Sequence, residues 1–570
     1  MLSVSGNQWA EISVNKRILE KYKIDYNLQD LLAKLIIHRN FTIEEISSID
    51  NKIILTNPFL NCKDFLNSGK ILKKNIDKDN KILIIGDYDV DGCVSTSLMV
   101  NFFNFLQVNY KFHIPSRTND GYGSNLNSLK KLLKDDQIDL VIMLDCGSNS
   151  HEMINHLNIK KIDSIIIDHH NIYNPYPNST VIINPKKECE YQKYNYLCAS
   201  YLTYFFLDSF IKDYNIEYNL NEDKIYVLLA TVADVMPLRY LNRILAIEVL
   251  DNFNPVNNLF IRNFFEEKKI NRKLTINDLA FFIGPILNAA GRIDDANKVV
   301  KLITTKDKKI RKELTKNLFS LNNKRQLIES NLLNEIDIEN QITKKNEIII
   351  IYEKNCPEGI MGIIAARIKE ITNKPCIILN LKNDIYKGSC RSTSNFNIGE
   401  YVQKGIQNKI IDQGGGHNLA AGLNIKKRNL LKFKKYINQI YSKKINEFKI
   451  RKYYLSKISL NAVSKVFFNE ISKAGPFGNE NYDPIFLIEN VKVLKPLILK
   501  KKYVTCYISI NKSKLVKAIS FNNLKSNISK NLLFNKKNID ILTKIVANNW
   551  NNKKLLQLEI IDVILKTNKA

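Results

Sequence analysis

The sequence predicts an α/β protein with two lobes, a helical linker between them and a C-terminal β-barrel. Three observations predict this arrangement. Short β-branched runs alternate with helix-patterned segments within 76–300, which is typical of a parallel sheet. A charged stretch at 301–345 carries Leu and Ile at helical spacing, and a shorter α/β region follows at 346–450. From 451 to 570, strand-like runs alternate with turns, as in a small barrel.

The composition excludes a wholly disordered chain and favours a polyanionic partner. The chain has 570 residues, with 85 Lys and Arg against 57 Asp and Glu, so its formal charge is +28. At about 150 residues per domain, this length suggests three or four domains. Basic side chains neutralise phosphates, which favours nucleic acid. The alternative is a Lys-rich composition without a functional cause, since Lys, Asn and Ile are abundant throughout.

The cysteine and hydropathy patterns favour a soluble cytoplasmic protein without a membrane partner, and a monomer is expected. The nine cysteines form no C-x-x-C pair, so neither a zinc knuckle nor a thioredoxin-like motif is indicated. Free thiols are typical of a reducing compartment. Residues 1–20 lack the pattern of a secretory signal, and no run of about 18 apolar residues occurs.

Residues 1–75 are expected to form a helical region of their own. Apolar residues recur at helical spacing in Leu28–Ile37, and Thr42 with Glu45 matches a capping box. The capping pattern predicts that a short helix begins after Thr42.

The catalytic domain is expected at 76–300, where three apolar runs read as buried parallel strands. These are Lys81–Ile85, Leu140–Leu144 and Ser164–Ile167. Helix-patterned segments between them, Ser95–Leu106 and Ser124–Leu133, are long enough for crossover connections. Each strand ends at acidic or imidazole residues, and ligands bind at that edge of open α/β sheets.

The regions after residue 300 predict a long helix, a second lobe and a barrel. In the second lobe, Glu347–Tyr352 and Pro375–Leu381 read as strands on either side of a helix at Gly359–Ile371. In the tail, Tyr503–Ile510 and Leu555–Ile564 read as strands.

Three carboxylates within five residues suggest a metal site after the first strand. Asp87, Asp89 and Asp91 alternate within the segment Gly86–Gly92. Clustered carboxylates repel one another, and a bound divalent cation resolves the repulsion. The alternative is a polar surface turn, because Asp and Gly are common in turns.

Further acids and histidines strengthen the metal hypothesis. Asp145, the triplet Asp168, His169 and His170, and Asp234 end separate predicted elements, so one sheet edge can collect them. Mixed carboxylate and imidazole ligands favour Mn²⁺-like ions. The set is large enough for two ions, and metals roughly 3.5–4 Å apart suit phosphodiester hydrolysis.

A family resemblance emerges from the ordered motifs. The segments GDYDVDG, LDCG, DHH and VADVMPL resemble the four signature motifs of the DHH phosphoesterase superfamily. The segments GPILNAAGRIDD, GSCRS, GGGHNLAAG and GPFG are similar to bacterial RecJ single-strand-specific exonucleases. The resemblance runs from about residue 80 to 490 and implies a two-lobed fold with an OB-like tail. One segment departs from the family pattern at two positions: Asn479–Asp483 carries Glu480 and Tyr482 where a Gly and a Pro are usual.

The resemblance implies roles for the residues of the first lobe. The implied metal ligands for two Mn²⁺ or Mg²⁺ ions are Asp89, Asp91, Asp145, His169 and Asp234. His170 is expected to contact the scissile phosphate. Asp87 and Asp168 are expected to orient ligands. Arg292 is expected to stabilise negative charge in the transition state.

The resemblance also implies a pocket for the 5′-terminal phosphate. Arg117, Ser389 and Arg391 are similar to residues that hold this phosphate, and Arg pairs bidentately with phosphate oxygens. Gly415, Gly416 and His417 are expected to contact nucleic acid, because successive glycines let backbone N–H groups approach a phosphate. The alternative for the glycine triplet is a tight strand-to-helix turn.

The implied activity is 5′→3′ hydrolysis of single-stranded DNA to 5′-mononucleotides in repair and recombination. Single-strand-binding protein and a helicase are expected as partners. One alternative is a phosphodiesterase of short RNA oligomers or cyclic dinucleotides, but those relatives are generally shorter. Another is a non-catalytic DNA-binding scaffold, which would be expected to have lost at least one of the metal ligands.

Overall fold

The protein is described by a computed structural model. It describes residues 1–49, 54–115, 125–338, 347–445, 451–510, 514–550 and 553–565. The chain divides into two compact units. The large unit contains Leu55–Met236 and Val249–Ile445, and the terminal unit contains Met1–Ile54, Pro237–Glu248 and Asn446–Ala570. Each is described by itself.

The first lobe of the large unit is built on a five-stranded parallel sheet of order β3-β2-β4-β5-β6. Its strands are β2 (Ile82–Ile85), β3 (Tyr110–His113), β4 (Leu140–Leu144), β5 (Asp163–Ile167) and β6 (Val181–Ile183). The three predicted strands are confirmed as the central strands β2, β4 and β5. The edge strands β3 and β6 carry no long apolar run that would predict them.

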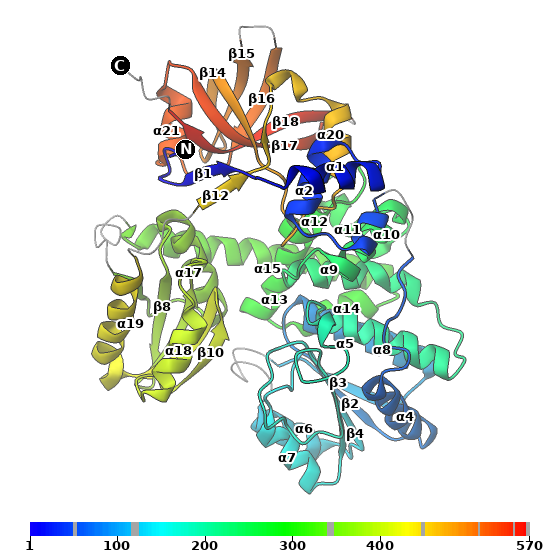
Figure 1. The fold of residues 1–570 in the computed structure, drawn as a ribbon. Helices are drawn as coiled ribbons and strands as arrows, with labels where there is room; N and C mark the ends of the chain where they lie inside the picture. The colour runs from blue at the N-terminus through cyan, green and yellow to red at the C-terminus, as the bar shows by residue number, and fades with distance from the viewer. Residues whose placement is uncertain are drawn as a thin grey trace. The chain divides into compact units, whose positions relative to one another are not determined.

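Helices cover both faces of this sheet (Figure 1). The helices are α4 (Lys63–Asp77), α5 (Val90–Leu106), α6 (Leu126–Asp135), α7 (His151–Ile159), α8 (Ala199–Asp213) and α9 (Lys224–Ala233). Leu129 of α6 and Leu157 of α7 pack against Leu83 and Val141 on one face. Helices α5 and α8 lie against the strands from the other face. The central strands β2, β4 and β5 are thus buried on both sides, which explains their continuous apolar sequences.

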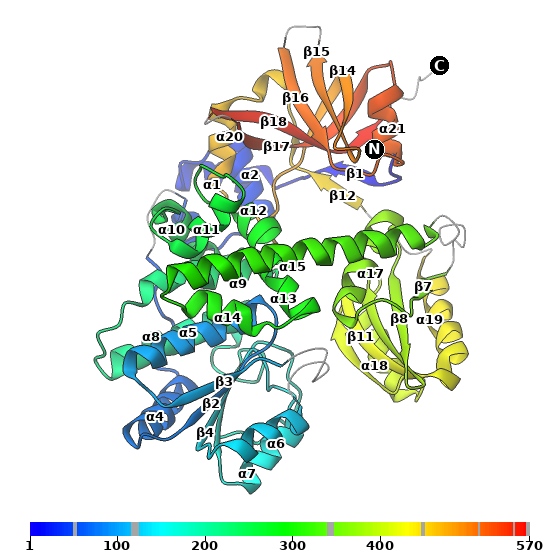
Figure 2. The same ribbon diagram turned by 180° about the vertical axis from the view of Figure 1, so that it is seen from behind.

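A helical layer links the first lobe to the second. It contains α11 (Leu259–Glu267), α12 (Ile276–Asp278), a π-helical turn (Leu279–Ile283), α13 (Gly284–Ile293), α14 (Asn297–Thr304) and α15 (Lys308–Glu335). Helix α15 contacts α11, α13 and α14 and also α17 of the second lobe (Figure 2). The long charged linker helix is therefore confirmed.

The second lobe has a five-stranded mixed sheet of order β10-β11-β9-β8-β7. Its elements are β7 (Ile349–Tyr352), α17 (Glu358–Thr372), β8 (Cys376–Lys382), β9 (Ile385–Arg391), α18 (Ile398–Gln407), β10 (Gln413–His417), β11 (Ala420–Lys426) and α19 (Leu430–Ile445). Helix α17 packs on one face through Ile360 and Ile364, and helix α19 packs on the other through Phe433. The glycine triplet forms strand β10, so the alternative of a strand-to-helix turn is wrong.

The terminal unit joins the beginning of the chain to its end. It contains β1 (Gln8–Glu11), α1 (Lys16–Asp25), α2 (Asp30–His38), α3 (Ile43–Ser47), most of α10 (Tyr240–Asn252) and β12 (Arg451–Tyr454). The capping box of Thr42 and Glu45 is present at the start of α3. Strand β1 pairs in parallel with β12, a pairing that the expectation of a helical region over 1–75 did not include.

The tail of the terminal unit is a closed β-barrel, as predicted. Its elements are β13 (Ser456–Lys457), α20 (Lys465–Ser472), β14 (Phe486–Leu499), β15 (Tyr503–Ile510), β16 (Lys514–Ser520), α21 (Asn527–Phe534), β17 (Ile539–Trp550) and β18 (Lys553–Ile564). The order β14-β15-β16-β18-β17 is closed by pairing of β14 with β17. In the described parts of the chain, none of the helices combines the length and hydropathy needed to cross a bilayer.

The departure from the family pattern keeps a tight turn. Glu480 adopts φ 56°, the left-handed region where glycine is favoured. The side chain of Asn481 is buried and donates hydrogen bonds to the carbonyl oxygens of Ala474 (2.9 Å) and Pro476 (3.0 Å). The turn is therefore held by Asn481 even though Glu480 replaces the usual glycine.

Candidate metal centre

The predicted acidic side chains gather at the carboxyl edge of the parallel sheet. Asp87 follows β2, Asp145 directly follows β4, and Asp168 directly follows β5. Asp234 reaches the same place from the C-terminal end of α9. Parallel strands present their carboxyl ends at one edge, so residues distant in the sequence converge there.

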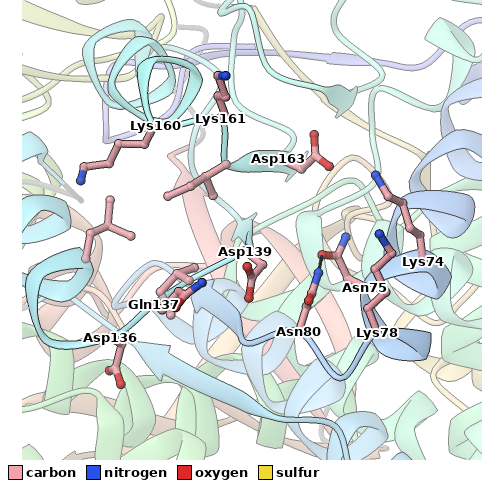
Figure 3. Close-up of a pocket in the computed structure, with 13 residues that line it drawn as sticks. Lys74, Asn75, Lys78, Asn80, Asp136, Gln137, Asp139, Lys160, Lys161 and Asp163 are labelled. Carbon is pink, nitrogen blue, oxygen red and sulfur yellow. Dashed lines mark hydrogen bonds between the residues drawn. The ribbon is translucent and has the colours of Figure 1, made fainter.

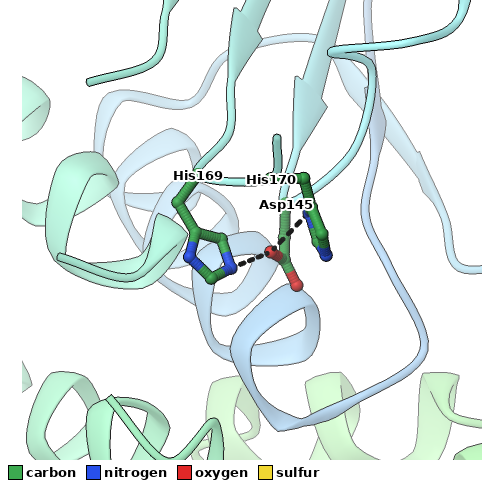
Figure 4. Close-up of side chains that lie close together, drawn as sticks. All are labelled: Asp145, His169 and His170. Carbon is green, nitrogen blue, oxygen red and sulfur yellow. Dashed lines mark ion pairs between the residues drawn. The ribbon is translucent and has the colours of Figure 1, made fainter. Parts of the chain in front are cut away.

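His169 lies at the centre of this cluster. Its Nε2 atom is 3.3 Å from Oδ1 of Asp145 and 3.5 Å from Oδ2 of Asp234. The same atom is 3.7 Å from Oδ2 of Asp91. Figure 4 shows Asp145 between the rings of His169 and His170. One imidazole nitrogen thus faces three carboxylates that come from three different elements.

Three overlapping groups of side chains have the spacing of metal ligands. Within each group, the ligand atoms all lie within 4.8 Å of one another: Asp145, His169 and His170; Asp91, His169 and Asp234; and Asp87, Asp89 and Asp145. Both carboxylate oxygens of Asp145 and the Nδ1 of His169 are buried without a hydrogen-bond partner. Unpaired buried polar atoms are costly, and a divalent cation would satisfy these ones. The residues therefore fit a pair of divalent ions.

The pKa shifts of these side chains also favour a metal site. Burial, followed by the charges of Asp91 and Asp89, raises the pKa of Asp145 well above its ordinary value. The same causes raise the pKa of Asp234. Burial also lowers the pKa of His169 to about 4, so its imidazole is neutral at pH 7 and suited to ligation. Positive charge is needed to keep this many carboxylates ionised.

Asp91 is held by the start of a helix. Its Oδ2 accepts a hydrogen bond from the backbone N–H of Ala199 (2.8 Å), and its Oδ1 accepts one from that of Ser200 (2.9 Å). These two N–H groups belong to the first turn of α8, which lacks intrahelical acceptors for them. The Asp91 side chain is therefore oriented, and the positive end of the helix favours its ionised form. No motif in the sequence marks Ala199 and Ser200 as its partners.

Asp168 orients the two histidines that follow it. Its Oδ1 accepts hydrogen bonds from the backbone N–H groups of His169 (2.7 Å) and His170 (3.1 Å), and lies 2.8 Å from Nδ1 of His170. Its Oδ2 accepts from the N–H of Ser148 (3.0 Å). Burial opposes ionisation of Asp168, but the charge of His170 and these hydrogen bonds hold its pKa well below the ordinary value.

The pKa of His170 is shifted upward, whereas the pKa of Asp168 is shifted downward. Burial alone would lower the pKa of its imidazole, but the charge and hydrogen bond of Asp168 outweigh burial and raise the pKa to about 10. Nδ1 of His170 is bonded to Asp168, and the side chain that carries the other ring nitrogen, Nε2, is 43% exposed. A protonated His170 suits contact with a phosphate.

The loop that carries Asp87 and Asp89 is tightly constrained. Asp89 is the N-cap of α5 and accepts from the N–H of Gly92 at 3.1 Å. A Cβ on Gly92 would lie 2.5 Å from backbone atoms of Asp87. Asp87 offers a ligand atom beside Asp89 and Asp145, a closer approach to the cluster than the orienting role expected from the sequence.

Arg292 lies where the two lobes of the large unit meet. Its guanidinium donates to the carbonyl oxygen of Gly359 at the start of α17 (3.0 Å). The preceding Gly291 packs so closely that a Cβ there would lie 2.2 Å from the carbonyl oxygen of Tyr88, within the acidic loop. Arg292 is therefore adjacent to the acidic loop in space, although about 200 residues separate them in sequence.

The residues expected to bind a 5′-phosphate or nucleic acid, apart from Arg117, share one sheet of the second lobe. Ser389 lies opposite Gly422 of β11, which lies opposite Gly415 of β10. In the next rung on the same face, Arg391 is aligned through β11 with His417. Gly416 lies between these two rungs. Arg117 lies outside the described residues.

The sheet surface between these residues is bare. A Cβ on Gly422 would meet no atom closer than 3.9 Å, and one on Gly415 none closer than 3.8 Å. By contrast, the guanidinium of Arg391 lies close against α17, because a Cβ on Gly362 would be 2.7 Å from it. The result is an open strip of backbone beside an arginine and a serine.

A contact that sequence reasoning missed joins this strip to the metal centre. The side-chain amide of Asn171, directly after the histidine pair, lies 3.1 Å from Nδ1 of His417. The backbone carbonyl of Asn171 accepts from Asn149 at 2.8 Å. The only available signal was the position of Asn171 next to the triplet in the sequence.

The opposite edge of the parallel sheet holds a separate cavity of about 500 Å³. Its lining contains none of the predicted site residues. Lys74, Lys78, Lys160 and Lys161 line it together with acidic and amide side chains, but the ammonium groups of Lys160 and Lys161 point away from the other two (Figure 3). This cavity therefore presents no convergent binding groups.

Comparison with known proteins identifies the domains. Residues 81–235 match the DHH family N-terminal domain, 345–443 match the DHHA1 domain, and 456–562 match the RecJ OB domain. A parallel sheet with acids and histidines at its carboxyl edge, followed by a DHHA1 lobe, defines a protein of the DHH superfamily. Within that superfamily, the chain belongs to the RecJ family.

Individual relatives agree over most of the chain. The single-stranded-DNA-specific exonuclease RecJ of Bacillus subtilis is 26% identical over 557 residues, which cover 94% of this chain and 68% of the relative. That of Haemophilus influenzae is 30% identical, over 63% of this chain and 66% of the relative. The fold matches the crystal structure of Thermus thermophilus RecJ in complex with Mn²⁺, with a TM-score of 0.80, 20% identity and coverage of 98% of this chain and 80% of that one.

Proposed function

We propose that the protein is a 5′→3′ exonuclease that hydrolyses single-stranded DNA to 5′-mononucleotides with two divalent ions, Mn²⁺ or Mg²⁺. The observation that carries the proposal is the pairing of two sites. The acid and histidine cluster around His169 suits phosphodiester hydrolysis. The strip with Ser389 and Arg391 suits a terminal phosphate, and the contact of Asn171 with His417 joins the two within one unit.

The activity of the relatives supports this assignment. Several curated relatives of this chain are named as single-stranded-DNA-specific exonucleases. The intact set of acids and histidines favours an enzyme over a non-catalytic scaffold. The barrel that matches the RecJ OB domain offers a further surface for a single strand.

The side chains have distinct tasks in the proposed mechanism. When bound, paired divalent ions stabilise the attacking and leaving oxygens and lower the pKa of an attacking water. Asp89, Asp91, Asp145, His169 and Asp234 would hold them. His170, kept protonated by Asp168, presents Nε2–H to the scissile phosphate. Arg292 places a positive charge beside the acidic loop, where it stabilises the negative charge that develops on the phosphate.

The direction of digestion along the strand follows from the strip that contains Ser389 and Arg391. If Ser389, Arg391 and the backbone N–H groups of Gly415 and Gly416 hold the 5′-phosphate, the next linkage of the strand lies toward the metal centre. The first bond cut is then near the 5′ end. Cleavage leaves a new 5′-phosphate that the same pocket can bind.

Labelled single strands test the proposal. With Mn²⁺ or Mg²⁺, a strand labelled at its 5′ end should lose the label at once as a mononucleotide. A strand labelled at its 3′ end should shorten progressively while the label stays on the long product. Attack from the 3′ end, equal cutting of a blunt duplex, or a preference for short RNA or cyclic dinucleotides would contradict the proposal.

We further propose that the protein acts in the cytoplasm as a monomer, in DNA repair and recombination, with single-strand-binding protein and a helicase as partners. All nine cysteines are free, and six of them are buried, which suits a reducing compartment. A helicase and a binding protein would supply the single strand that the proposed reaction consumes. Co-purification and analytical ultracentrifugation test these assignments.

A further inference from the structure

We propose that Lys186 is a further substrate-binding residue whose ammonium group takes a backbone phosphate of the single strand next to the metal centre. This inference rests on the proposed function and adds a specific contact to it. Lys186 belongs to none of the sequence motifs discussed above.

The backbone holds Lys186 beside the histidine pair. Strand β6 ends at Ile183, whose carbonyl oxygen accepts from the N–H of Asp168 (3.0 Å). The buried side chain of Asn184 donates to the carbonyl oxygen of His170 (2.9 Å) and to Oγ of Ser148 (2.7 Å). Its own Oδ1 accepts from the N–H of Lys186 at 2.8 Å. The segment that carries Lys186 is thus tied to the histidine pair.

The charge of Lys186 acts on both lobes of the large unit. After burial, it is the largest influence that lowers the pKa of His417 on β10. It also contributes to lowering the pKa of His169 and opposes the raised pKa of Asp234. Asn184 holds the backbone of Lys186 beside His170, and Asn171 next to His170 contacts His417, so the segment of Lys186 lies near both the metal centre and the end of the glycine strand. A strand that runs from one to the other would pass it.

The ammonium of Lys186 is also available. It is half-buried, and across the described parts of the chain it forms no ion pair and no hydrogen bond. Its neighbour Lys187 differs, because it pairs with Asp64 at 2.7 Å and donates to the carbonyl oxygen of Ile182 at 2.6 Å. Burial lowers the pKa of Lys186, against the pull of Asp168 and Asp234. A half-buried cation without a partner is costly, and a phosphate oxygen would supply the partner.

The main competing role is that Lys186 only offsets the charge of the acidic cluster. In that role it would affect metal affinity and kcat, but not the response to phosphates of the substrate. The two roles are separated by changing the substrate's charge at single positions.

The experiment compares wild-type enzyme with Lys186→Gln, Lys186→Arg and the matched control Lys187→Gln. The initial release of the first nucleotide is measured at saturating Mn²⁺ on 5′-phosphorylated single strands. Each strand carries one neutral methylphosphonate linkage at an internal position, which removes one phosphate charge. The salt dependence of kcat/KM is measured on the unmodified strand.

We expect Lys186→Gln to raise KM about tenfold, as for loss of a hydrogen bond to a charged group, with kcat changed less. The salt slope should fall by about 0.7, the value for one phosphate of a single strand. One methylphosphonate position that slows the wild type should have no further effect on this variant. Lys186→Arg should keep the wild-type profile, and so should Lys187→Gln.

The inference would be overturned if Lys186→Gln kept the wild-type salt slope and responded to every methylphosphonate as the wild type does. A fall in kcat alone, restored by more Mn²⁺, would assign Lys186 to the acidic cluster and also overturn it. Failure of the wild type to cut single strands would instead reject the proposed function. Lys186→Met gives a second neutral variant if Lys186→Gln does not fold.

Discussion

The carboxylate of Asp91 caps the first turn of α8, with Oδ1 2.9 Å from the backbone nitrogen of Ser200. The same carboxylate lies among the atoms that have the spacing of metal ligands. A single side chain thus connects the stability of a helix to the geometry of the proposed active site.

Replacing Asp91 should therefore affect both stability and activity. Asp91→Ala removes the acceptor of two N–H groups of α8, and loss of such a cap costs about 1 kcal/mol. The unfolding temperature of the metal-free protein should fall by roughly 2–4 °C, and nuclease activity should be lost. Thermal unfolding in EDTA and a nuclease assay measure the two effects. An unchanged unfolding temperature would show that the cap contributes nothing to stability.

Unlike Asp91→Ala, Asp145→Asn should stabilise the metal-free protein. Both oxygens of Asp145 are buried without hydrogen bonds, and neighbouring carboxylates repel its charge. The neutral amide removes this repulsion, so the metal-free variant should unfold at a higher temperature than the wild type. Activity should still be lost. Mn²⁺ should raise the unfolding temperature of the wild type by mass action, but should have much less effect on the variant.

The pH dependence of stability gives a second test at Asp145. Burial and the charges of Asp91 and Asp89 raise its pKa in the folded protein, so the folded state retains a proton that the unfolded state releases. The stability of the metal-free wild type should therefore fall as the pH rises above about 4, the ordinary pKa of Asp. Asp145→Asn should flatten this fall. Denaturant unfolding from pH 4 to 8 measures it, and parallel curves for both proteins would contradict the assignment.

The central part of the fold was predictable from the sequence because burial on two sides requires continuous apolar strands. The runs at β2, β4 and β5 fulfil this, and each ends in an acid at the edge where ligands bind. Strands β3 and β6 lie at the edges of the sheet; β3 is only half-buried and β6 has three residues, so their sequences lack that signal. The pairing of β1 with β12 joins segments more than 400 residues apart, and no local pattern predicts such a partner.

The acids and histidines of the site were easier to predict than the groups that orient them. The acids and histidines form recognisable motifs, whereas the groups that orient them are backbone atoms or isolated side chains. Ala199 lies 108 residues from Asp91 and contributes only an N–H group. The glycine triplet was expected to contact nucleic acid or to turn. It forms a strand that pairs with β11, where the three glycines lie opposite Leu423, Gly422 and Ala421.

Close packing around the acidic loop makes Gly291 a sensitive position. A Cβ at Gly291 would lie 2.2 Å from the carbonyl oxygen of Tyr88, and backbone cannot rotate away as a side chain can. Gly291→Ala should displace the loop that carries Asp87, Asp89 and Asp91 and reduce kcat at least tenfold. Gly69→Ala in α4 is a suitable control for packing, because its Cβ would meet nothing closer than 3.7 Å and it lies outside both proposed sites. Circular dichroism should confirm that both variants fold, and wild-type activity in Gly291→Ala would refute the prediction.

Arg391 should set the preference for a 5′-phosphate. It lies on the same face of β9 as Ser389, beside the bare glycine strip, and its planar guanidinium can pair with two phosphate oxygens. Arg391→Ala should weaken binding of 5′-phosphorylated strands by about tenfold or more, while binding of 5′-hydroxyl strands changes little. Lys387→Ala is the matched control, because Lys387 lies on the same face of β9 but pairs with Glu358 at 3.0 Å. Competition between the two kinds of strand measures the preference. Arg391 would be excluded from the 5′-phosphate pocket if Arg391→Ala weakened binding of both kinds of strand equally, or if Lys387→Ala had the same effect. Other residues would then have to determine the polarity of the enzyme.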